Sequence, residues 1–334
     1  MTEAVHRLIT RWTPGVFCLL TALIFGSGCR SAAVPGNEPP PWDVARAEVI
    51  RWRSDDPSFG QDFALEASGL AASEHELYVP SEKYARLLLI DPEAEPRARI
   101  LRLEVPRRSE LEGIAAVDGG VLLCDEAHAA VYEVTIGEDD REAAGREREP
   151  LVARELPLDG VDVEGGKIGF EGIEVGRNST WVYLLLERSE TDAGGCVSRI
   201  YRLRRQGGRL TADRDPLDIE LPDCTWRLTG LAWWGERMIA LKTQYPGERY
   251  EVVAVDLTTG AARVMLDLTV LLRALEKEGW SNNVEGIAVT EDGALWLVSD
   301  NAVTGIVDDS LPPPSGSRAL LLRIPPSTAT FDVQ

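Results

Sequence analysis

The fold of this 334-residue chain is decided by one stretch, residues 282–289 (NNVEGIAV), which is followed by residues 293–301 (GALWLVSDN). The stretch reads as two short apolar strands with a turn between them, from Thr290 to Gly293. One carboxylate, Glu285, opens the first strand and another, Asp300, closes the second. If the strands form a hairpin, both carboxylates lie at its open end, on the same side of the molecule.

The same pattern recurs four more times along the chain. Two copies keep the glutamate, in Glu112-Gly113-Ile114 and Glu171-Gly172-Ile173, and two replace it, in Ser68-Gly69-Leu70 and Thr229-Gly230-Leu231. The five glycines, residues 69, 113, 172, 230 and 286, are separated by 44, 59, 58 and 56 residues. A period of about 40 to 60 residues, with short strands in each unit, is the sequence signature of a β-propeller.

The repeats also indicate how the propeller closes. Each repeat supplies four strand candidates except the fifth, which ends after residues 318–324 at Pro325-Pro326. The missing strand is available in residues 45–52, and pairing an N-terminal strand with the last blade removes an open sheet edge. We therefore expect an all-β fold, a single β-propeller of five blades closed by an N-terminal strand. Six blades are the alternative, if one long loop hides a further sheet.

One helix is expected, between Asp267 and Gly279. Its leucines at 268, 271, 272 and 275 recur at the spacing of one helix face, and Gly279 ends the pattern. The helix enters the fifth repeat just before the Glu285 motif.

Composition limits the class of protein. With 44% hydrophobic residues the chain can bury a large core, and the repeat overrides the two-domain organisation that its length alone suggests. The formal charge of −20 argues against binding nucleic acid or an anionic membrane surface by electrostatics. It fits a protein that holds cations or simply stays soluble, and we expect a monomer.

Residues 1–28 read as an export signal of the lipoprotein type. His6, Arg7 and Arg11 precede the apolar run 16–25, which is too short to span a bilayer as a helix. The small residues directly before Cys29 resemble the lipobox of bacterial lipoproteins, in which the cysteine is acylated, although Gly26 replaces the usual leucine. We expect Cys29 to be lipidated and the protein to be anchored at the cell envelope, on the periplasmic or surface side. A plain secreted or periplasmic protein is the alternative.

Two further segments follow this signal. Residues 29–44 are rich in proline and read as a semi-rigid tether, which leaves residues 45–334 as the propeller domain. In that domain Cys124 lies in an apolar strand and is expected to be a buried thiol. Cys196 and Cys224 lie in two predicted loops that should emerge on the same face. We predict a disulfide between them, as an exported protein allows, with two free thiols as the alternative.

The repeats predict a concentration of carboxylates at one mouth of the channel. The start of each first strand and the end of each second strand point to one face, which places Glu112, Glu171 and Glu285 around the mouth, with Ser68 and Thr229 in the other two positions. A second set lies slightly outside: Asp125, Glu126, Glu187, Asp300 and Glu82, joined by Arg188 and Lys242.

Such a ring has two interpretations. Carboxylates held close together raise one another's pKa unless a cation compensates, and Ca²⁺ takes 6–8 oxygen ligands in flexible geometry. We therefore predict Ca²⁺ as the cofactor, with Arg188 and Lys242 contacting the substrate and with these metal ligands: Glu112, Glu171, Glu285, Asp125, Glu126, Glu187 and Asp300. In the alternative, each glutamate caps backbone amides or pairs with an arginine, and the glycines are needed only because strands crowd near the axis.

Other catalytic constellations are absent from the sequence. It contains no Gly-x-Ser-x-Gly, Walker loop, His-Glu-x-x-His or Cys-x-x-Cys motif. Only two histidines, His75 and His128, follow the export signal, which argues against a Ser/His/Asp triad and against a histidine-rich zinc site. We interpret His128 as a solvated loop residue.

At these motifs the chain resembles a known family, the phytase-like domain called "esterase-like activity of phytase". The resemblance covers roughly residues 60–325 and rests on the following segments: 68–71, 111–114 with 125–126, 169–172 with 186–187, and 284–287 with 299–301. The chain is also similar to the SdiA-regulated propeller family, which shares the repeated Glu-Gly-Ile. The resemblance implies a β-propeller with phosphoesterase or esterase chemistry. Lys242-Thr243 departs from it, because the family tends to have an acid or Glu-Arg there.

Two functions therefore remain open. The first is an envelope-anchored, calcium-dependent hydrolase of phosphate or carboxylic esters at the acidic mouth, with a small-molecule ester as its substrate. The second is a non-catalytic propeller that binds a ligand or protein partner at the cell envelope through the same face.

Overall fold

The computed structural model describes residues 41–54, 61, 65–74, 76–93, 97–142, 149–163, 169–245, 247–301 and 317–327. The predicted export signal, Cys29, most of the tether and His75 lie outside the described residues. The chain divides into two compact units, and everything below concerns the second, Pro39–Gln334. None of the helices in its described part is long and apolar enough to cross a membrane.

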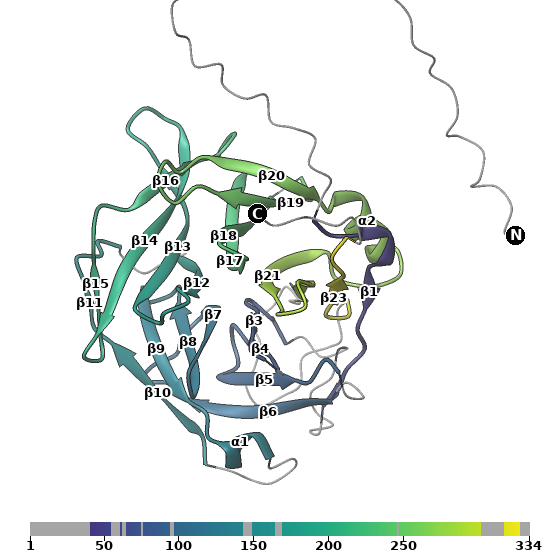
Figure 1. The fold of residues 1–334 in the computed structure, drawn as a ribbon, viewed down its shortest axis with the longest axis horizontal. Helices are drawn as coiled ribbons and strands as arrows, with labels where there is room; N and C mark the ends of the chain where they lie inside the picture. Colours follow the sequence, from purple (N-terminus) through teal and green to yellow (C-terminus); the bar gives the residue numbers. More distant parts are fainter. Residues whose placement is uncertain are drawn as a thin grey trace, which may run out of the picture. The chain divides into compact units, whose positions relative to one another are not determined.

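The described residues form sheets in which most neighbouring strands are antiparallel (Figure 1). The first repeat contains β3 (Ala71–Ala72), β4 (Leu77–Pro80), β5 (Arg86–Ile90) and β6 (Arg97–Glu104). The second contains β7 (Leu111–Val117), β8 (Gly120–Asp125), β9 (Ala130–Thr135) and β10 (Leu151–Leu156). These two repeats share one sheet, because β10 pairs in parallel with β6, which also pairs with the short β2 (Arg53–Ser54).

The third repeat contains β12 (Phe170–Val175), β13 (Trp181–Glu190) and β14 (Cys196–Gln206), and β14 pairs with both β15 (Arg209–Ala212) and β16 (Leu217–Glu220). A two-residue strand, β11 (Leu158–Asp159), adds to β15. The fourth repeat is a regular sheet of β17 (Trp226–Trp234), β18 (Arg237–Gln244), β19 (Arg249–Val255) and β20 (Ala262–Asp267). The fifth contains β21 (Asn283–Val289), β22 (Leu295–Asp300) and β23 (Leu321–Ile324).

The first strands of the five repeats lie around a common centre (Figure 1). Each of β3, β7, β12, β17 and β21 contacts the first strand of the repeat before it and of the repeat after it, and β21 contacts β3, so the five strands close on themselves. The prediction of a β-propeller is therefore confirmed. The number of blades stays a prediction, since the hydrogen-bonded sheets of the described residues number four, with two repeats merged into one.

Glycine is required where these first strands meet. A Cβ atom on Gly113 would lie 2.7 Å from the Cα of Gly172, and one on Gly286 would lie 2.7 Å from the carbonyl carbon of Gly69. Both neighbours are backbone atoms of the adjacent repeat and cannot rotate away. The repeated glycine therefore sets how closely neighbouring repeats approach each other near the axis.

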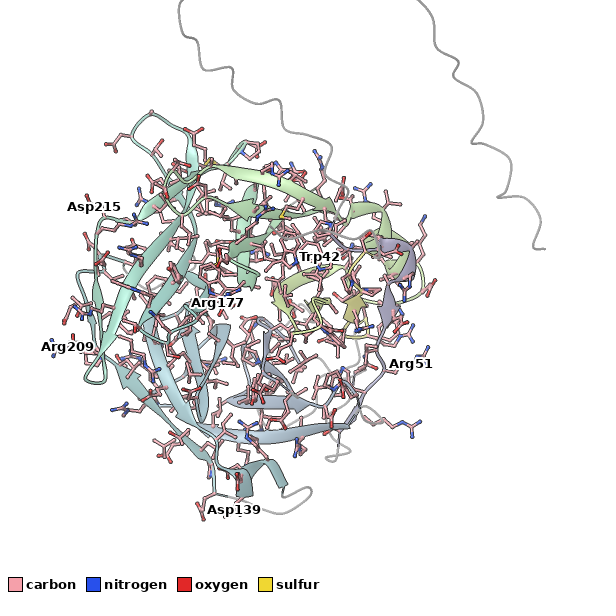
Figure 2. All side chains as sticks on the ribbon, in the orientation of Figure 1. Trp42, Arg51, Asp139, Arg177, Arg209 and Asp215 are labelled. Atoms are coloured by element: carbon pink, nitrogen blue, oxygen red, sulfur yellow. A yellow bond between two sulfur atoms is a disulfide. The ribbon has the colours of Figure 1, made fainter. Side chains whose placement is uncertain are left out.

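The fifth repeat is completed by the N-terminal part of the domain, as predicted. β1 (Glu48–Val49) pairs antiparallel with β23, placing Val49 opposite Leu322. The strand is shorter than the expected residues 45–52, because a 3₁₀ turn at Val44–Arg46 follows Asp43, whose side chain accepts a hydrogen bond from the backbone N–H of Ala45. Trp42 is buried ahead of this turn and donates from its indole nitrogen to the carbonyl of Gly293 at 3.0 Å. Figure 2 shows Trp42 inside the domain, whereas Arg209 and Asp139 lie at its outer rim.

The described connections contain two α-helices. α2 (Thr269–Glu276) lies where the leucine spacing predicts it, and it buries Leu272 against the core shared by the fourth and fifth repeats. A short helix, α1 (Glu138–Glu142), begins the charged connection between β9 and β10.

Cys196 and Cys224 form a disulfide bond across 28 residues. Closing a loop of that length contributes roughly 3–4 kcal/mol in the chain-entropy account. Cys124 is a free, fully buried thiol whose sulfur accepts a hydrogen bond from the N–H of Gly113 at 3.2 Å.

Candidate functional site

The acidic residues of the Glu-Gly-Ile motifs lie in β-bulges. In four repeats the register of the first hairpin shifts at the glycine: between Leu111 and Ile114, Phe170 and Gly172, Leu228 and Gly230, and Val284 and Gly286. A bulged residue has no partner on the second strand, and its side chain is turned away from the regular alternation of the sheet. Glu112, Glu171, Thr229 and Glu285 are the residues that these bulges reorient.

Three of the reoriented side chains line the end of a narrow central cavity. Glu171, Thr229 and Glu285 surround it together with the motif glycines, and its volume of ≈10 Å³ is about that needed to hold one water molecule. We call the group around this opening the acidic mouth; its carboxylates are Glu112, Glu171 and Glu285, with Glu82, Glu126, Glu187 and Asp300 around them.

Burial and mutual repulsion disfavour the charged forms of these carboxylates. Glu112 and Glu171 are 5% and 6% exposed, and burial raises the pKa of each well above its usual value, with further increases from neighbouring glutamates. Burial and the charge of Asp300 raise the pKa of Glu285 to about 8, although Arg227 and a hydrogen bond from Asn283 oppose the increase. The acidic mouth is therefore an electrostatically unfavourable cluster.

The tightest group of carboxylates comes from two neighbouring repeats. Glu126 of the second repeat and Glu171 and Glu187 of the third each offer one oxygen, and these oxygens all lie within 4.8 Å of one another. Burial raises the pKa of Glu126 to about 7, with a further increase from Glu187. In the described part of the chain, Glu126 and Glu171 have neither a hydrogen-bond partner nor an ion-pair partner for their side chains.

One arginine, which the sequence analysis did not identify, enters this cluster. Arg227 donates through one terminal nitrogen to Glu187 at 2.8 Å and through the other to Glu285 at 3.1 Å, and its Nε donates to Thr243 at 3.2 Å. The residue stands three positions before the motif glycine, and Asn283 occupies the same position in the fifth repeat. Comparing the residue three positions before the motif glycine in each repeat could have identified Arg227 from the sequence.

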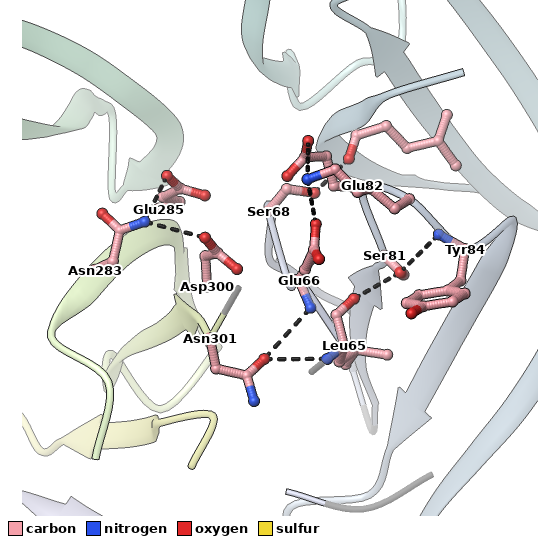
Figure 3. Close-up of polar contacts among 12 residues, drawn as sticks. Leu65, Glu66, Ser68, Ser81, Glu82, Tyr84, Asn283, Glu285, Asp300 and Asn301 are labelled. Atoms are coloured by element: carbon pink, nitrogen blue, oxygen red, sulfur yellow. Dashed lines mark hydrogen bonds and ion pairs between the residues drawn. The ribbon is translucent and has the colours of Figure 1, made fainter. Parts of the chain in front are cut away.

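The junction of the fifth and first repeats forms the other side of the mouth (Figure 3). Asn283 donates to both Glu285 at 3.0 Å and Asp300 at 3.2 Å. In Figure 3 these residues face Glu66, Ser68 and Glu82 of the first repeat. Glu66 is ion-paired with Lys83, which also lies 3.2 Å from Glu82. Burial raises the pKa of Glu82 to about 7.

Asp125, predicted as a metal ligand, is instead engaged in a buried hydrogen-bond network. Its carboxylate accepts from the backbone N–H of Glu110 at 3.1 Å and from the hydroxyl of Tyr132 at 3.0 Å, and it lies 2.9 Å from Nδ1 of His128. His128 is therefore not the purely solvated residue that we expected. Ser81, at the equivalent position of the first repeat, likewise holds its own loop through hydrogen bonds to backbone groups. We take Asp125 to be a residue that stabilises the loop after β8.

The two predicted substrate contacts also have other partners. Arg188 donates to the carbonyl of Cys224, beside the disulfide. The ammonium of Lys242 lies 3.0 Å from Glu251 and 4.1 Å from the ring centroid of Trp226. The structure thus brings together Glu112, Glu171, Glu285, Glu126, Glu187 and Asp300 at the acidic mouth, with Arg227 as the basic residue that contacts them.

The donor set of the acidic mouth fits a hard divalent cation. Ca²⁺ takes carboxylate and neutral oxygens at 2.3–2.6 Å, so ligand oxygens around one ion lie within about 5 Å of each other. Glu126, Glu171 and Glu187 satisfy that requirement. Nearby Thr229 supplies a buried hydroxyl oxygen, which has no hydrogen-bond partner among the described residues.

Several solved structures match this chain at low sequence identity. A solved glutaminyl cyclase from Myxococcus xanthus is 14% identical and matches with a TM-score of 0.49, covering 84% of this chain and 97% of that one. A glucose dehydrogenase-type putative oxidoreductase from Thermus thermophilus is 15% identical, with a TM-score of 0.43 over 84% and 99% of the two chains. A streptogramin B lyase is 9% identical, with a TM-score of 0.42 over 84% and 97%. These likenesses carry no argument about activity.

Sequence comparison places the chain more specifically. No curated protein matches it. Residues 37–302, well over half of its length, match the family described as "Phytase-like: Esterase-like activity of phytase". This chain therefore belongs to the Phytase-like family.

Proposed function

We propose that this protein binds a divalent cation, Ca²⁺, at the acidic mouth and hydrolyses phosphate or carboxylic esters there. The observation that carries the proposal is the approach of Glu126, Glu171 and Glu187, whose oxygens lie within 4.8 Å of one another. Glu126 and Glu171 have no basic partner among the described residues, although selection for stability alone would supply one, since a buried carboxylate without a partner is costly. Membership of the Phytase-like family adds the expectation of ester chemistry.

In this proposal the residues of the acidic mouth have three roles: binding the cation, positioning Glu285 and accepting a proton. A bound divalent cation would polarise the ester oxygen and make a bound water more acidic. Glu126, Glu171 and Glu187 would hold it, while Arg227 and Asn283 keep Glu285 in place through their hydrogen bonds. Glu82, whose pKa is raised to about 7, is suited to accept a proton from the attacking water near neutral pH.

The decisive variant is Glu171→Gln, which keeps the shape of the side chain and removes its charge. We expect Ca²⁺ to raise the melting temperature of the wild type and to support hydrolysis of p-nitrophenyl phosphate or p-nitrophenyl acetate. Glu171→Gln should lose at least about 100-fold in Ca²⁺ affinity, since charged ligand contacts are worth roughly 1.5–3 kcal/mol or more each. Both effects can be measured by calorimetry and by release of p-nitrophenol.

Glu174→Gln is the matched control for this test. Glu174 lies on the same strand, β12, and burial raises its pKa to about 8, but no carboxylate of the acidic mouth contributes to that shift. This variant should bind Ca²⁺ and turn over substrate as the wild type does. Ca²⁺ binding without turnover of either ester would favour the second function, a non-catalytic propeller that binds a ligand or partner. A wild type that does not respond to Ca²⁺ would contradict the proposal.

We also propose that the protein is exported and lipid-anchored through Cys29. The disulfide between Cys196 and Cys224 supports an oxidising compartment, because such bonds are rare in the reducing cytosol. In a bacterial host, the wild type should partition into the detergent phase of Triton X-114 and incorporate labelled palmitate. Cys29→Ser should remain in the aqueous phase without label. Equal partitioning of the two proteins would rule out this anchor.

A further inference from the structure

The fourth repeat differs from the other four at the acidic mouth. In the other repeats, two positions at the mouth hold carboxylates, apart from Ser68. The first is the residue before the motif glycine, and the second is the residue near the end of the second strand that corresponds to Asp300. In the fourth repeat the same two positions hold Thr229 and Thr243. The equivalence follows from the strand register, since Thr243 pairs with Arg227 as Asp300 pairs with Asn283.

The side chains of this repeat offer hydrogen-bond donors toward the mouth. Arg227 can only donate. Thr243 accepts from Nε of Arg227, which leaves its own hydroxyl hydrogen to donate. Thr229 is 1% exposed, lines the central cavity beside Glu171 and Glu285, and has no hydrogen-bond partner for Oγ1 among the described residues. An unsatisfied buried hydroxyl at such a place indicates a ligand or water that completes it.

We propose that Arg227, Thr229 and Thr243 form an anion-binding sector that receives the negatively charged group of the ligand beside the bound cation. The guanidinium fork matches the geometry of phosphate and carboxylate oxygens. Glu187 connects the two parts of the site, because one of its oxygens bonds Arg227 while the residue also belongs to the carboxylate trio. An anion placed here contacts the guanidinium on one side and the cation on the other.

The charges impose an order of binding. Without a cation, Arg227 faces Glu126, Glu171, Glu187 and Glu285, and the excess of negative charge repels an incoming anion. Bound Ca²⁺ reverses that balance locally. The anion should therefore bind only after the cation. This inference rests on the cation site of the proposed function, and it adds that the ligand carries an anionic group that Arg227 recognises.

Calorimetry with methylphosphonate, a non-hydrolysable anion, tests the sector in the full-length protein. The wild type should bind methylphosphonate in the presence of Ca²⁺ and show no binding in EDTA. Arg227→Gln should weaken binding by about 10- to 100-fold, which corresponds to the loss of a charge-assisted hydrogen bond. Arg227→Lys, which keeps the charge but not the fork, should fall between the two. Thr229→Val should weaken methylphosphonate binding several-fold.

Arg209→Gln is the matched control, because Arg209 is also an ion-paired arginine, bonded to Asp159 at 2.7 Å, but lies at the outer rim (Figure 2). It should bind both ligands as the wild type does. Ca²⁺ binding that persists in Arg227→Gln shows that the variant is folded and that the cation site is intact. Methylphosphonate binding that is unchanged in Arg227→Gln, or equal with and without Ca²⁺, overturns the sector while the cation site stands. Failure of Ca²⁺ to bind the wild type overturns both proposals.

Discussion

Gly286→Val should destabilise the protein by at least about 5 kcal/mol, which is a large part of the net stability of a typical domain. Its Cβ would lie 2.5 Å from a methyl group of Val298, 2.7 Å from the carbonyl carbon of Gly69 and 2.8 Å from the backbone nitrogen of Leu70. The last two atoms belong to the first repeat, so the strain falls at the contact between the first and fifth repeats, where the propeller closes. Relief would require the first and fifth repeats to move apart.

Chemical denaturation followed by circular dichroism measures this effect. Gly286→Ala, which adds one carbon, should cost about 3 kcal/mol and gives a graded value if the valine variant does not fold. Gly195→Val is the control, because Gly195 is exposed and the nearest atom to its added Cβ is the Thr191 hydroxyl oxygen at 3.4 Å. If Gly286→Val is as stable as Gly195→Val, the repeats do not close on one another as described.

The repeat pattern was sufficient to predict the architecture, because the motif glycine has the same role in every repeat: it allows neighbouring first strands to approach each other. Its spacing predicts the first strands, and the shortage of a strand in the fifth repeat predicts β1. The pairing of Val49 with Leu322 confirms that closure. These features depend on main-chain geometry, which a repeated motif specifies directly.

The side-chain partners in the site were harder to predict, because they form between repeats. Arg227 reaches Glu187 of the third repeat and Glu285 of the fifth, a contact that no single motif contains. Asp125 and Glu126 are adjacent in sequence, yet the first is used by its own loop and the second faces the mouth. Lys242 has the right charge for an anion contact, but Glu251, on the next strand, pairs with it.

In EDTA, the free energy of unfolding should fall by on the order of 5 kcal/mol between pH 5 and pH 8.5. The pKa of Glu285 rises from its usual value of 4.5 to about 8 in the folded protein. Between these values the unfolded chain has released its proton while the folded chain keeps it, so each pH unit favours unfolding by about 1.36 kcal/mol for such a group. The stability that protonated Glu285 contributes is therefore fully present below its pKa in the unfolded chain, and it is lost as the pH rises through its pKa in the folded protein.

Other carboxylates of the mouth act in the same direction. Burial raises the pKa values of Glu82 and Glu126 to about 7 and raises those of Glu112 and Glu171 well above their usual range. Thermal melts across this pH range should show a decrease of about 10 °C in EDTA. Saturating Ca²⁺ should reduce or reverse the decrease, because a cation bound to the folded state favours the charged carboxylates. The same pH profile with and without Ca²⁺ would contradict this account.

Glu112→Gln removes one titratable carboxylate from the acidic mouth and keeps the shape of its side chain. Glu112 has no hydrogen-bond or ion-pair partner for its side chain among the described residues, so its neutral analogue should stabilise the EDTA form at pH 8 by about 1–3 kcal/mol and flatten the pH profile. Glu76 is buried to the same degree but is ion-paired with Arg99 and Arg141. Glu76→Gln should therefore destabilise the protein by about 3 kcal/mol, since it leaves two arginines without their carboxylate. Opposite signs for these two buried glutamates, at the same pH, would show that the acidic mouth keeps its carboxylates at a cost in stability.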